Sequence, residues 1–307
     1  MSIKTTLPPA SSVAILRCRN KFNELADQQS WSAGPEGLIT PHSKVSFTAH
    51  VTLRPPLKWA GGKRWLAPHL LDIWDQHRHR RFVEPFCGGL SIPLTLQPEL
   101  ALLNDINPHL INFYSQLKRG LSLTIEMRND QKLFYQHRVR FNELVTNGDW
   151  RTAEAAQLFY YLNRTGFNGL CRFNQRGEFN VPFGRHTSIT YDRDFSALKK
   201  IFKRWKFLSC DIMSLPIDPD DFIYADPPYD VEFTTYSPGG FTWDDQERTA
   251  EWLAKHKGPV VLSNQATTRI VKLYKKLGFQ LRYLKAPRRI SCTGDRTAAK
   301  EVLALKT

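Results

Sequence analysis

The 307-residue sequence has no run of about 18 apolar residues and no strongly amphipathic basic helix, which argues against a membrane protein. Its first residues contain no long apolar segment of the kind found in secretory signal peptides. Cysteine is scarce and never forms a CxxC pair, so neither a disulfide framework nor a structural zinc site is expected. We therefore expect a reduced, cytoplasmic protein without a metal ion, whose cysteines are mostly small buried residues: Cys18, Cys87, Cys171, Cys210 and Cys292.

Positive charge is present in excess. The formal net charge is +14 and the pI is near 9.6, which favours a polyanionic partner, nucleic acid before any other. Residues 151–210 carry 11 Lys/Arg against 4 Asp/Glu, and residues 269–300 carry 10 against 1, giving +7 and +9. These two stretches exceed the charge of the whole chain, so the rest is slightly acidic. We interpret them as phosphate-tracking faces, with an ordinary solvated surface as the alternative.

Short apolar runs closed by small or polar residues indicate buried parallel strands. Such runs cover 81–86, 100–103, 221–225 and 259–262, and helical stretches at 108–119 and 244–256 lie between them. In parallel sheets the functional groups gather at the carboxyl ends of the strands. The alternation predicts an α/β fold with a Rossmann-like, doubly wound sheet.

The domain organisation follows from where this alternation is interrupted. Residues 120–205 hold a helical stretch at 152–163 and a loop region rich in Gly, Asn and Arg. We expect an inserted, mostly helical domain there, between two parts of a catalytic domain at 53–119 and 206–307. Residues 1–52 are rich in Pro, Ser and Thr, and only 13–28 could form a short helix. They are an N-terminal extension to which the sequence assigns no role.

A first group of motifs suits a nucleoside cofactor. The strand at Phe82-Val-Glu-Pro-Phe runs into Cys87-Gly-Gly, and Asp105 closes the next strand. Glycines allow close backbone approach to a ligand, and a carboxylate can take ribose hydroxyls. No GxGxxG motif is present, so a dinucleotide is not supported. The segment 57–63, Leu-Lys-Trp-Ala-Gly-Gly-Lys, lacks the Walker A pattern; Trp59 could pack against the cofactor and Lys63 could reach its carboxylate.

The second motif is Asp226-Pro227-Pro228-Tyr229, which follows a very apolar run. Two prolines cannot continue a central strand, and they leave carbonyl groups available as acceptors. The Asp226 carboxylate and the Pro227 carbonyl could hold the N–H bonds of an exocyclic amine, whose lone pair is otherwise delocalised into the ring. Tyr229 could stack on the base, so positioning and electrostatics would supply the catalysis.

The motifs KWAGGK, EPFCGG, NDIN, NRTGFNGLCRFNQRGEFNVPFG and ADPPY occur in this order between Leu57 and Leu305. In this respect the chain resembles the Dam-type family of DNA adenine-N6 methyltransferases. The resemblance implies a monomeric methyltransferase that uses S-adenosylmethionine to methylate N6 of a flipped adenine in double-stranded bacterial or phage DNA, within GATC. It implies that the catalytic residues are Asp226, Pro227 and Tyr229. It implies that the cofactor is bound by Trp59, Lys63, Glu84, Phe86, Gly88, Asp105 and Asp226.

The same resemblance makes the inserted domain a target-recognition domain. DNA would be contacted by Lys58, Phe167, Asn168, Leu170, Arg172, Asn174, Pro182 and Arg185. Within this set, Arg172 is a candidate for a bidentate contact to a guanine edge, and Phe167 could wedge into the space that the adenine leaves.

Two departures from the family and two alternatives remain open. Leu90 stands where the family usually has glycine or is next to one, so it could crowd the cofactor or shift the turn. Asp230 and Glu232 place two extra carboxylates close to Tyr229. Methylation of cytosine N4 or of RNA would use the same motif. A catalytically silent DNA-binding protein on this scaffold is the alternative from another functional class.

Overall fold

The computed structural model describes residues 53–230, 240–286 and 299–306. The helix expected at 13–28 lies outside these residues, as does Glu232.

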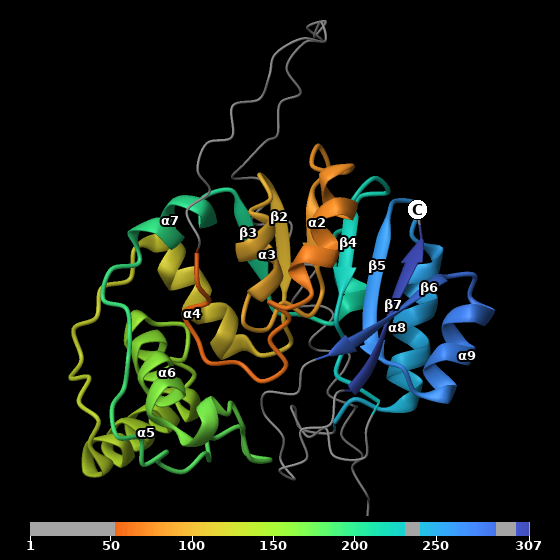
Figure 1. Ribbon diagram of the computed structural model, residues 1–307. Helices are drawn as coiled ribbons and strands as arrows, with labels where there is room; N and C mark the ends of the chain where they lie inside the picture. Colours follow the sequence, from red (N-terminus) through yellow and green to blue (C-terminus); the bar gives the residue numbers. More distant parts are fainter. Residues whose placement is uncertain (1–52, 231–239, 287–298, 307) are drawn as a thin grey trace, which may run out of the picture.

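A seven-stranded sheet organises the molecule (Figure 1). Its strand order is β3-β2-β1-β4-β5-β7-β6; neighbouring strands among the first five are parallel, and β7 is antiparallel to both β5 and β6. The predicted α/β doubly wound sheet is confirmed, including the four predicted strands. The strands are β1 (Phe82–Glu84), β2 (Ala101–Asn104), β3 (Trp205–Leu208), β4 (Phe222–Ala225), β5 (Val260–Gln265), β6 (Gln280–Ala286) and β7 (Ala299–Lys306).

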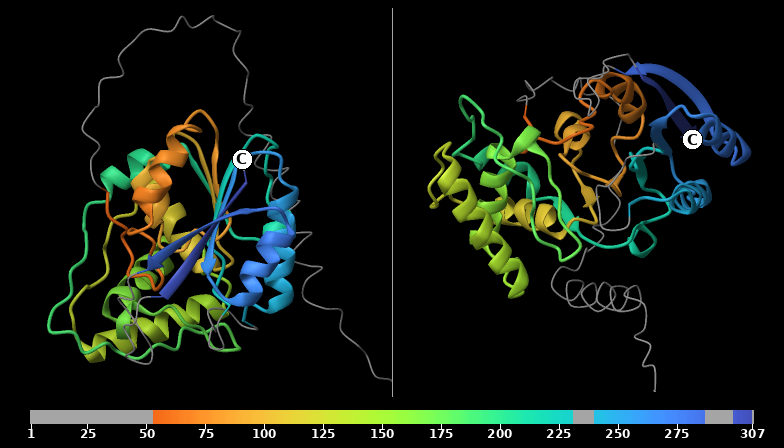
Figure 2. Two further views of the ribbon diagram at one scale, coloured as in Figure 1. Left: turned by 45° about the vertical axis from the view of Figure 1, so that its right-hand side comes forward. Right: turned by 90° about the horizontal axis from the view of Figure 1, so that it is seen from below.

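Helices cover both faces of the sheet (Figure 2, left). One face packs against α2 (Ala67–Asp75), α3 (Ser91–Leu96), α4 (Pro108–Arg119) and α7 (Ser196–Phe202), and the other against α8 (Trp243–Lys255) and α9 (Thr268–Lys276). The helices expected at 108–119 and 244–256 are therefore present. Short 3-10 turns, η1 and η2, cover Phe167–Gly169 and Ile212–Ser214.

Alternation along each strand divides the core into two layers. On β4, Phe222 and Tyr224 face the α2–α4 side, whereas Ile223 and Ala225 face α8 and α9. On β7, Leu303 and Val302 divide in the same way. Successive side chains of a strand point to opposite faces, so strands covered on both sides consist almost entirely of apolar residues.

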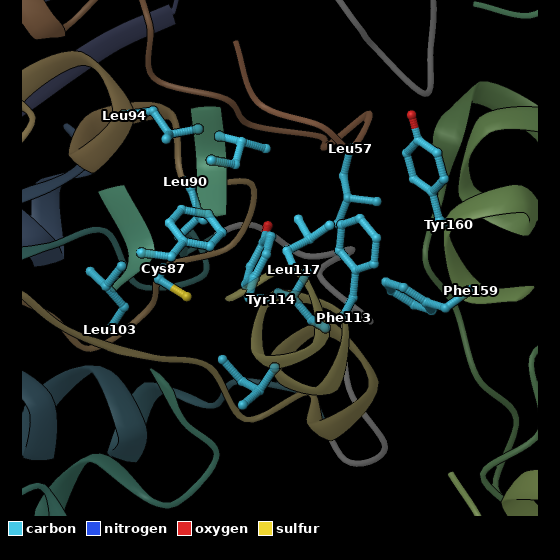
Figure 3. Close-up of a cluster of buried hydrophobic side chains, with 14 of the residues drawn as sticks. Leu57, Cys87, Leu90, Leu94, Leu103, Phe113, Tyr114, Leu117, Phe159 and Tyr160 are labelled. Atoms are coloured by element: carbon cyan, nitrogen blue, oxygen red, sulfur yellow. The ribbon is translucent and has the colours of Figure 1, made fainter. Parts of the chain in front are cut away.

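The segment between α4 and β3 carries α5 (Gln131–Thr146) and α6 (Ala153–Thr165), which lie at the lower left of Figure 1. Nearly every side chain of α6 is buried, because this helix packs against α4 on one side and α5 on the other. Figure 3 shows Phe159 and Tyr160 of α6 beside Phe113 of α4. The insert thus shares one hydrophobic core with the sheet. The boundaries at 120 and 205 remain a prediction.

Local signals set the ends of α4, which carries the insert. Asn107 caps its first turn by accepting hydrogen bonds from the backbone N–H groups of His109 and Leu110, and Pro108 occupies the first helical position. Gly120 ends the helix with a φ of 99°, which only glycine adopts at little cost.

Candidate active site at the carboxyl ends of the parallel strands

Three acidic residues meet at the same edge of the sheet. Glu84 is the last residue of β1, Asp105 follows β2, and Asp226 follows β4. These three strands are neighbours in the order β2-β1-β4, so their carboxyl ends lie together. The structure thus brings together the acids that the sequence placed in two separate motifs.

The glycine turn after β1 is shaped by Trp59. A Cβ atom on Gly88 would lie 2.7 Å from Nε1 of Trp59, and one on Gly89 would lie 2.7 Å from its Cβ. The glycines therefore let the 57–63 segment lie directly against the turn. The backbone N–H of Gly88 donates to Oδ2 of Asp105 (3.0 Å), and the hydroxyl of Tyr114 donates to the Gly88 carbonyl (2.7 Å). Trp59, Gly88 and Asp105 thus form one unit, and their role in binding the cofactor stays a prediction.

Burial dominates the electrostatics of this unit. It raises the pKa of Asp105 to about 6, although the backbone N–H groups of Asn107 and Gly88 act in the opposite direction. Glu84 is 3% exposed, and its Oε2 has no hydrogen-bond partner among the described residues. Burial, followed by repulsion from Asp226 and Asp105, raises the pKa of Glu84 well above its usual range. A buried group of carboxyls with an oxygen left unpaired suits a cationic ligand.

Asp226 contacts Ser263 and Lys63. Its Oδ1 accepts a hydrogen bond from the Ser263 hydroxyl (2.8 Å) and lies 3.5 Å from Nζ of Lys63. Both of these contacts fall on Oδ1, and no hydrogen bond to Oδ2 is found among the described residues, so Oδ2 can accept from a substrate. Burial raises the pKa of Asp226 to about 6, against the lowering effects of Lys63 and Ser263. The side chain still has 18% of its surface exposed, so a substrate can reach it.

Lys63 lies inside the site and has partners within the protein. Its Nζ contacts both carboxylate oxygens of Glu301 (3.0 and 3.2 Å) and lies 4.2 Å from the ring centroid of Tyr229. The predicted role of Lys63 as a ligand for the cofactor carboxylate stays a prediction. In this structure its ammonium joins Glu301, Asp226 and Tyr229.

The proline turn is fixed from behind by an amide network. Gln246 of α8 donates to the carbonyl of Pro228 (2.6 Å), and Asn264 donates to Gln246 (3.0 Å) and to the hydroxyl of Tyr274 (3.0 Å). These polar side chains are buried and hydrogen-bonded, which fixes the backbone of the turn.

A groove of about 480 Å³ opens beside Tyr229. Arg269 crosses it, pairing with Asp230 and lying 4.5 Å above the ring of Trp243. The extra carboxylate that the sequence placed here is thus neutralised by Arg269. The groove is lined by Tyr229, Asp230, Phe241, Trp243, Thr267, Thr268 and Arg269. Phe86, predicted as a cofactor residue, packs edge-on against Phe241 with ring centroids 5.9 Å apart.

Lys58 links the cofactor segment to the insert. Its backbone N–H donates to Asn163 (2.9 Å), and Asn163 donates in turn to the carbonyls of Lys58 (2.8 Å) and Gly169 (3.2 Å). The Lys58 side chain donates to the carbonyl of Arg164 (3.0 Å) and passes over Gly169, where any Cβ atom would lie 2.3 Å from it. Desolvation and the charge of Arg164 lower the pKa of Lys58.

The predicted DNA-contacting residues differ in exposure. Phe167, Asn168, Arg172, Pro182 and Arg185 are exposed, whereas Leu170 is half-buried against the core. Asn168 and Arg185 adopt left-handed backbone conformations with φ of 53° and 49°.

The residues from 172 to 180 form a narrow hairpin-like loop, held by an isolated bridge between Phe173 and Phe179. Asn174 accepts from the backbone of Arg176 and Glu178, so it shapes this turn. Arg172 donates to the side chain of Asn180 (2.9 Å) and remains exposed.

Leu90 does not extend into the cofactor unit. Its φ is 60° and its side chain is 0% exposed, packed in the core near Cys87 and Tyr114 (Figure 3). Because a left-handed conformation is costly for leucine, its burial must offset that strain. Of the two possibilities raised by the sequence, the structure shows a turn that directs Leu90 into the core.

Sequence reasoning missed Glu301, Ser263 and Asn163 as site residues. A charged residue at the start of an otherwise apolar run, as Glu301 is, was the available signal. Ser263 closes a predicted strand, but nothing in the pattern assigned it a partner.

Other features of the described residues lie outside this site. None of the helices in these ranges is long and apolar enough to cross a membrane, and the same residues contain no cluster of three or more metal-ligating side chains. A larger groove of about 690 Å³ lies between the segments 122–129 and 189–193, and no predicted site residue lines it.

Comparison with known proteins places these observations in a family. Residues 59–290 match the family described as D12 class N6 adenine-specific DNA methyltransferase. The chain is 38% identical over 276 residues to a DNA adenine methylase of Vibrio cholerae, covering 82% of this chain and 95% of that protein. It is 34% identical to the DNA adenine methylase of Escherichia coli K12 over 273 residues, covering 81% and 94%. It is 33% identical to a type II methyltransferase of Lactococcus lactis over 258 residues, covering 78% and 89%.

Proposed function

Because the chain belongs to the family of D12 class N6 adenine-specific DNA methyltransferases, we propose that it transfers the methyl group of S-adenosylmethionine to N6 of an adenine flipped out of duplex DNA, within the sequence GATC. Family membership makes it an adenine-specific DNA methyltransferase with this methyl donor. The flipped base, the tetranucleotide and the roles of individual residues are the proposed part. We further propose that it acts as a monomer in the cytoplasm; the relatives at 34–38% identity are bacterial proteins.

The observation that supports the residue roles best is the geometry of Asp226. Its Oδ1 contacts Ser263 and Lys63, and its side chain keeps 18% of its surface exposed. Tyr229, three residues further along the chain, lines the groove. Lys63 lies over one face of the Tyr229 ring, so a base that stacks on Tyr229 must use the other face. An adenine in that position donates an N6 hydrogen to Asp226, which directs the nitrogen lone pair toward the methyl group.

The residues around Glu84 and Asp105 fit the cofactor. S-adenosylmethionine carries a sulfonium and an ammonium, and the partly unpaired buried carboxyls of this edge stabilise positive charge. When bound, it would supply an electrophilic methyl carbon for the adenine nitrogen, with the sulfonium sulfur as the leaving group that keeps the electron pair of the broken carbon–sulfur bond. The product nitrogen then loses one proton, which the Asp226 carboxylate accepts and passes to water.

The DNA-reading role falls to the exposed residues of the 167–185 segment. Arg172 is presented on a loop that Asn180 stiffens, which suits a bidentate contact to guanine. Phe167 is 48% exposed, so its ring is accessible to DNA, and it is the candidate for the wedge.

The test is methyl transfer from labelled S-adenosylmethionine to duplex DNA, followed by digestion to nucleosides and long-read sequencing of the modified DNA. We expect N6-methyladenine within GATC. N4-methylcytosine, or transfer to RNA alone, would support the alternative substrates, and DNA binding without transfer would support a silent binding protein.

Two variants define the catalytic residue. Asp226→Asn should lower the transfer rate by about 10²-fold or more, because it replaces an anionic acceptor at the reacting amine. Asp244→Asn, an exposed acid in the first turn of α8, is the matched control and should retain the wild-type rate. Both proteins should bind DNA as the wild type does.

A further inference from the structure

We infer that Glu301 is a positioning residue for methyl transfer: it holds the Lys63 ammonium so that the Asp226 carboxylate stays available to the N6 hydrogen of adenine. This inference rests on the role of Asp226 in the proposed function. It concerns a residue at the far end of the chain from Lys63, 238 positions away.

The first step of the argument is the burial of Lys63. Its side chain is 7% exposed, so its charge must be balanced by groups within the protein. Its Nζ lies 3.0 Å from one oxygen of Glu301 and 3.2 Å from the other, but 3.5 Å from Asp226. The two acids share one ammonium, and the hydrogen-bonded partner is Glu301.

The topology explains why Glu301 can do this. β7 is antiparallel to β5, and Glu301 pairs in register with Gln265, the last residue of β5. The early residues of β7 therefore lie at the edge where the parallel strands end. Glu301 is also 7% exposed, so the Lys63–Glu301 pair is shielded from water and is geometrically fixed.

The second step is what happens without Glu301. Lys63, Asp226 and Glu301 together carry a net charge of −1, which favours the positive charge that develops on N6. With Glu301 neutral, the net charge of the three residues becomes zero, and the Lys63 ammonium pairs with Asp226 alone. The acceptor for the N6 hydrogen is then tied up by Lys63.

Few described charged groups lie close enough to Asp226 to change its pKa. Among the described residues, the titratable groups coupled to Asp226 are Lys63 and four groups on β1, β4, α9 and β7: Glu84, Tyr224, Tyr274 and Glu301. Of these, Lys63 lowers the pKa of Asp226 and Glu301 raises it. Removing the charge of Glu301 should therefore lower the pKa of Asp226, and removing the charge of Lys63 should raise it.

The experiment compares the wild type with Glu301→Gln, Glu301→Asp and the control Glu251→Gln, an exposed acid of α8. The single-turnover rate on a duplex containing GATC is measured from pH 5 to 9, together with the dissociation constants of S-adenosylmethionine and DNA. For Glu301→Gln we expect a rate loss on the order of tenfold and dissociation constants within about twofold of the wild-type values. The acid limb of its pH–rate profile, where the rate falls as Asp226 becomes protonated, should be displaced to lower pH. Lys63→Met should displace that limb to higher pH.

Glu301→Asp keeps the charge, so its acid limb should stay in place even if the shorter side chain lowers the rate. If Glu301→Gln retains the rate and the limb of the wild type, as Glu251→Gln should, the inference is wrong. If its rate falls with no displacement of the limb, Glu301 is a structural residue only. If Glu301→Gln does not fold, a limb displaced in Glu301→Asp overturns the inference in the same way. Absence of transfer to adenine by the wild type would instead overturn the proposed function.

Discussion

At the scale of single residues, the site depends on close approach between Trp59 and the turn at Gly88. The indole lies where a side chain at position 88 or 89 would otherwise be, so the cofactor unit requires glycine for steric reasons as well as for its backbone angle. Substitutions at this turn can therefore separate steric overlap with Trp59 from backbone strain.

Gly88→Ala should destabilise the protein and weaken cofactor binding. Gly88 and Gly61 both have positive φ, 41° and 78°, so alanine is strained at either position by about 1–2 kcal/mol. At Gly88 the new Cβ would in addition meet Trp59 at 2.7 Å, whereas nothing lies within 4 Å of a Cβ at Gly61. We expect the loss of unfolding free energy for Gly88→Ala to exceed that of Gly61→Ala by about 1–3 kcal/mol. Urea unfolding and a cofactor titration of both variants measure this, and equal losses would contradict the steric argument.

At the scale of structural elements, the insert and the cofactor segment are joined through the end of α6. Asn163 is 0% exposed and makes three hydrogen bonds, two to the backbone of Lys58 and one to Gly169. One amide thereby links the segment next to Trp59 with the first turn of the DNA-reading segment. Cofactor and DNA sites are then expected to respond together when this residue changes.

Asn163→Ala should cost about 3 kcal/mol of unfolding free energy, roughly 1 kcal/mol for each lost hydrogen bond. It should weaken both cofactor and DNA binding. The control is Asn142→Ala on α5, where the side chain also bonds the backbone of the insert, at Phe179 (2.8 and 3.2 Å), but does not contact the 57–63 segment. Isothermal titration of both variants with S-adenosylmethionine checks the link: unchanged cofactor affinity in Asn163→Ala would rule it out.

The 172–180 loop is the element that carries base discrimination in our proposal. Arg172→Ala should reduce the preference for GATC over a duplex with one altered guanine by about 1–3 kcal/mol, while leaving non-specific binding nearly intact. Arg176→Ala, at the exposed end of the same loop, should lower affinity for all duplexes alike. Competition binding with single-base variants distinguishes them. A uniform loss for Arg172→Ala would make it a phosphate contact.

The structural elements also differ in how much of their arrangement could be predicted from the sequence. The four parallel strands and the acids that follow them were predictable, because burial and strand ends leave local patterns of apolar and polar residues. The pairing of Glu301 with Lys63 was not, since it depends on β7 entering the sheet between β5 and β6 in the antiparallel sense. The contact of Asn163 with Lys58 spans 105 positions and leaves no local pattern either. The sequence predicted an inserted domain at 120–205, and its boundaries stay a prediction; helix α6 of this segment packs into the core that it shares with the sheet.

At the scale of the whole molecule, a basic protein with net charge +14 holds three buried or partly buried acids at the carboxyl ends of its parallel strands. In our proposal, DNA contacts the basic exterior, and the cofactor contacts the carboxyls of Glu84, Asp105 and Asp226. In the free enzyme, burial destabilises the ionised forms of all three acids, and at Asp226 the Lys63 ammonium offsets only part of this effect. The unfolding free energy of the free enzyme should therefore fall as pH rises, whereas it rises with pH in proteins whose acids are mostly paired.

The sign follows from the pKa shifts. Asp105 and Asp226 have pKa values of about 6 in the folded protein, against 3.8 ordinarily, and the pKa of Glu84 is raised well above its ordinary 4.5. A carboxyl with a raised folded pKa contributes stability that is present below its unfolded pKa and is lost as pH rises through the folded value. From these groups, the unfolding free energy of the cofactor-free enzyme should fall between pH 4 and 7.

Glu84→Gln isolates one of the three groups. Glutamine does not titrate, so the variant should match the wild type near pH 4 and become progressively more stable than it toward pH 7, by urea unfolding of the cofactor-free proteins. Asp244→Asn, which removes an exposed acid, should leave the difference flat. With S-adenosylmethionine present, the advantage of Glu84→Gln at pH 7 should shrink or reverse, because the cationic ligand stabilises the ionised carboxyl. A difference between Glu84→Gln and the wild type that stays constant from pH 4 to 7 would show that burial does not destabilise the ionised form of Glu84.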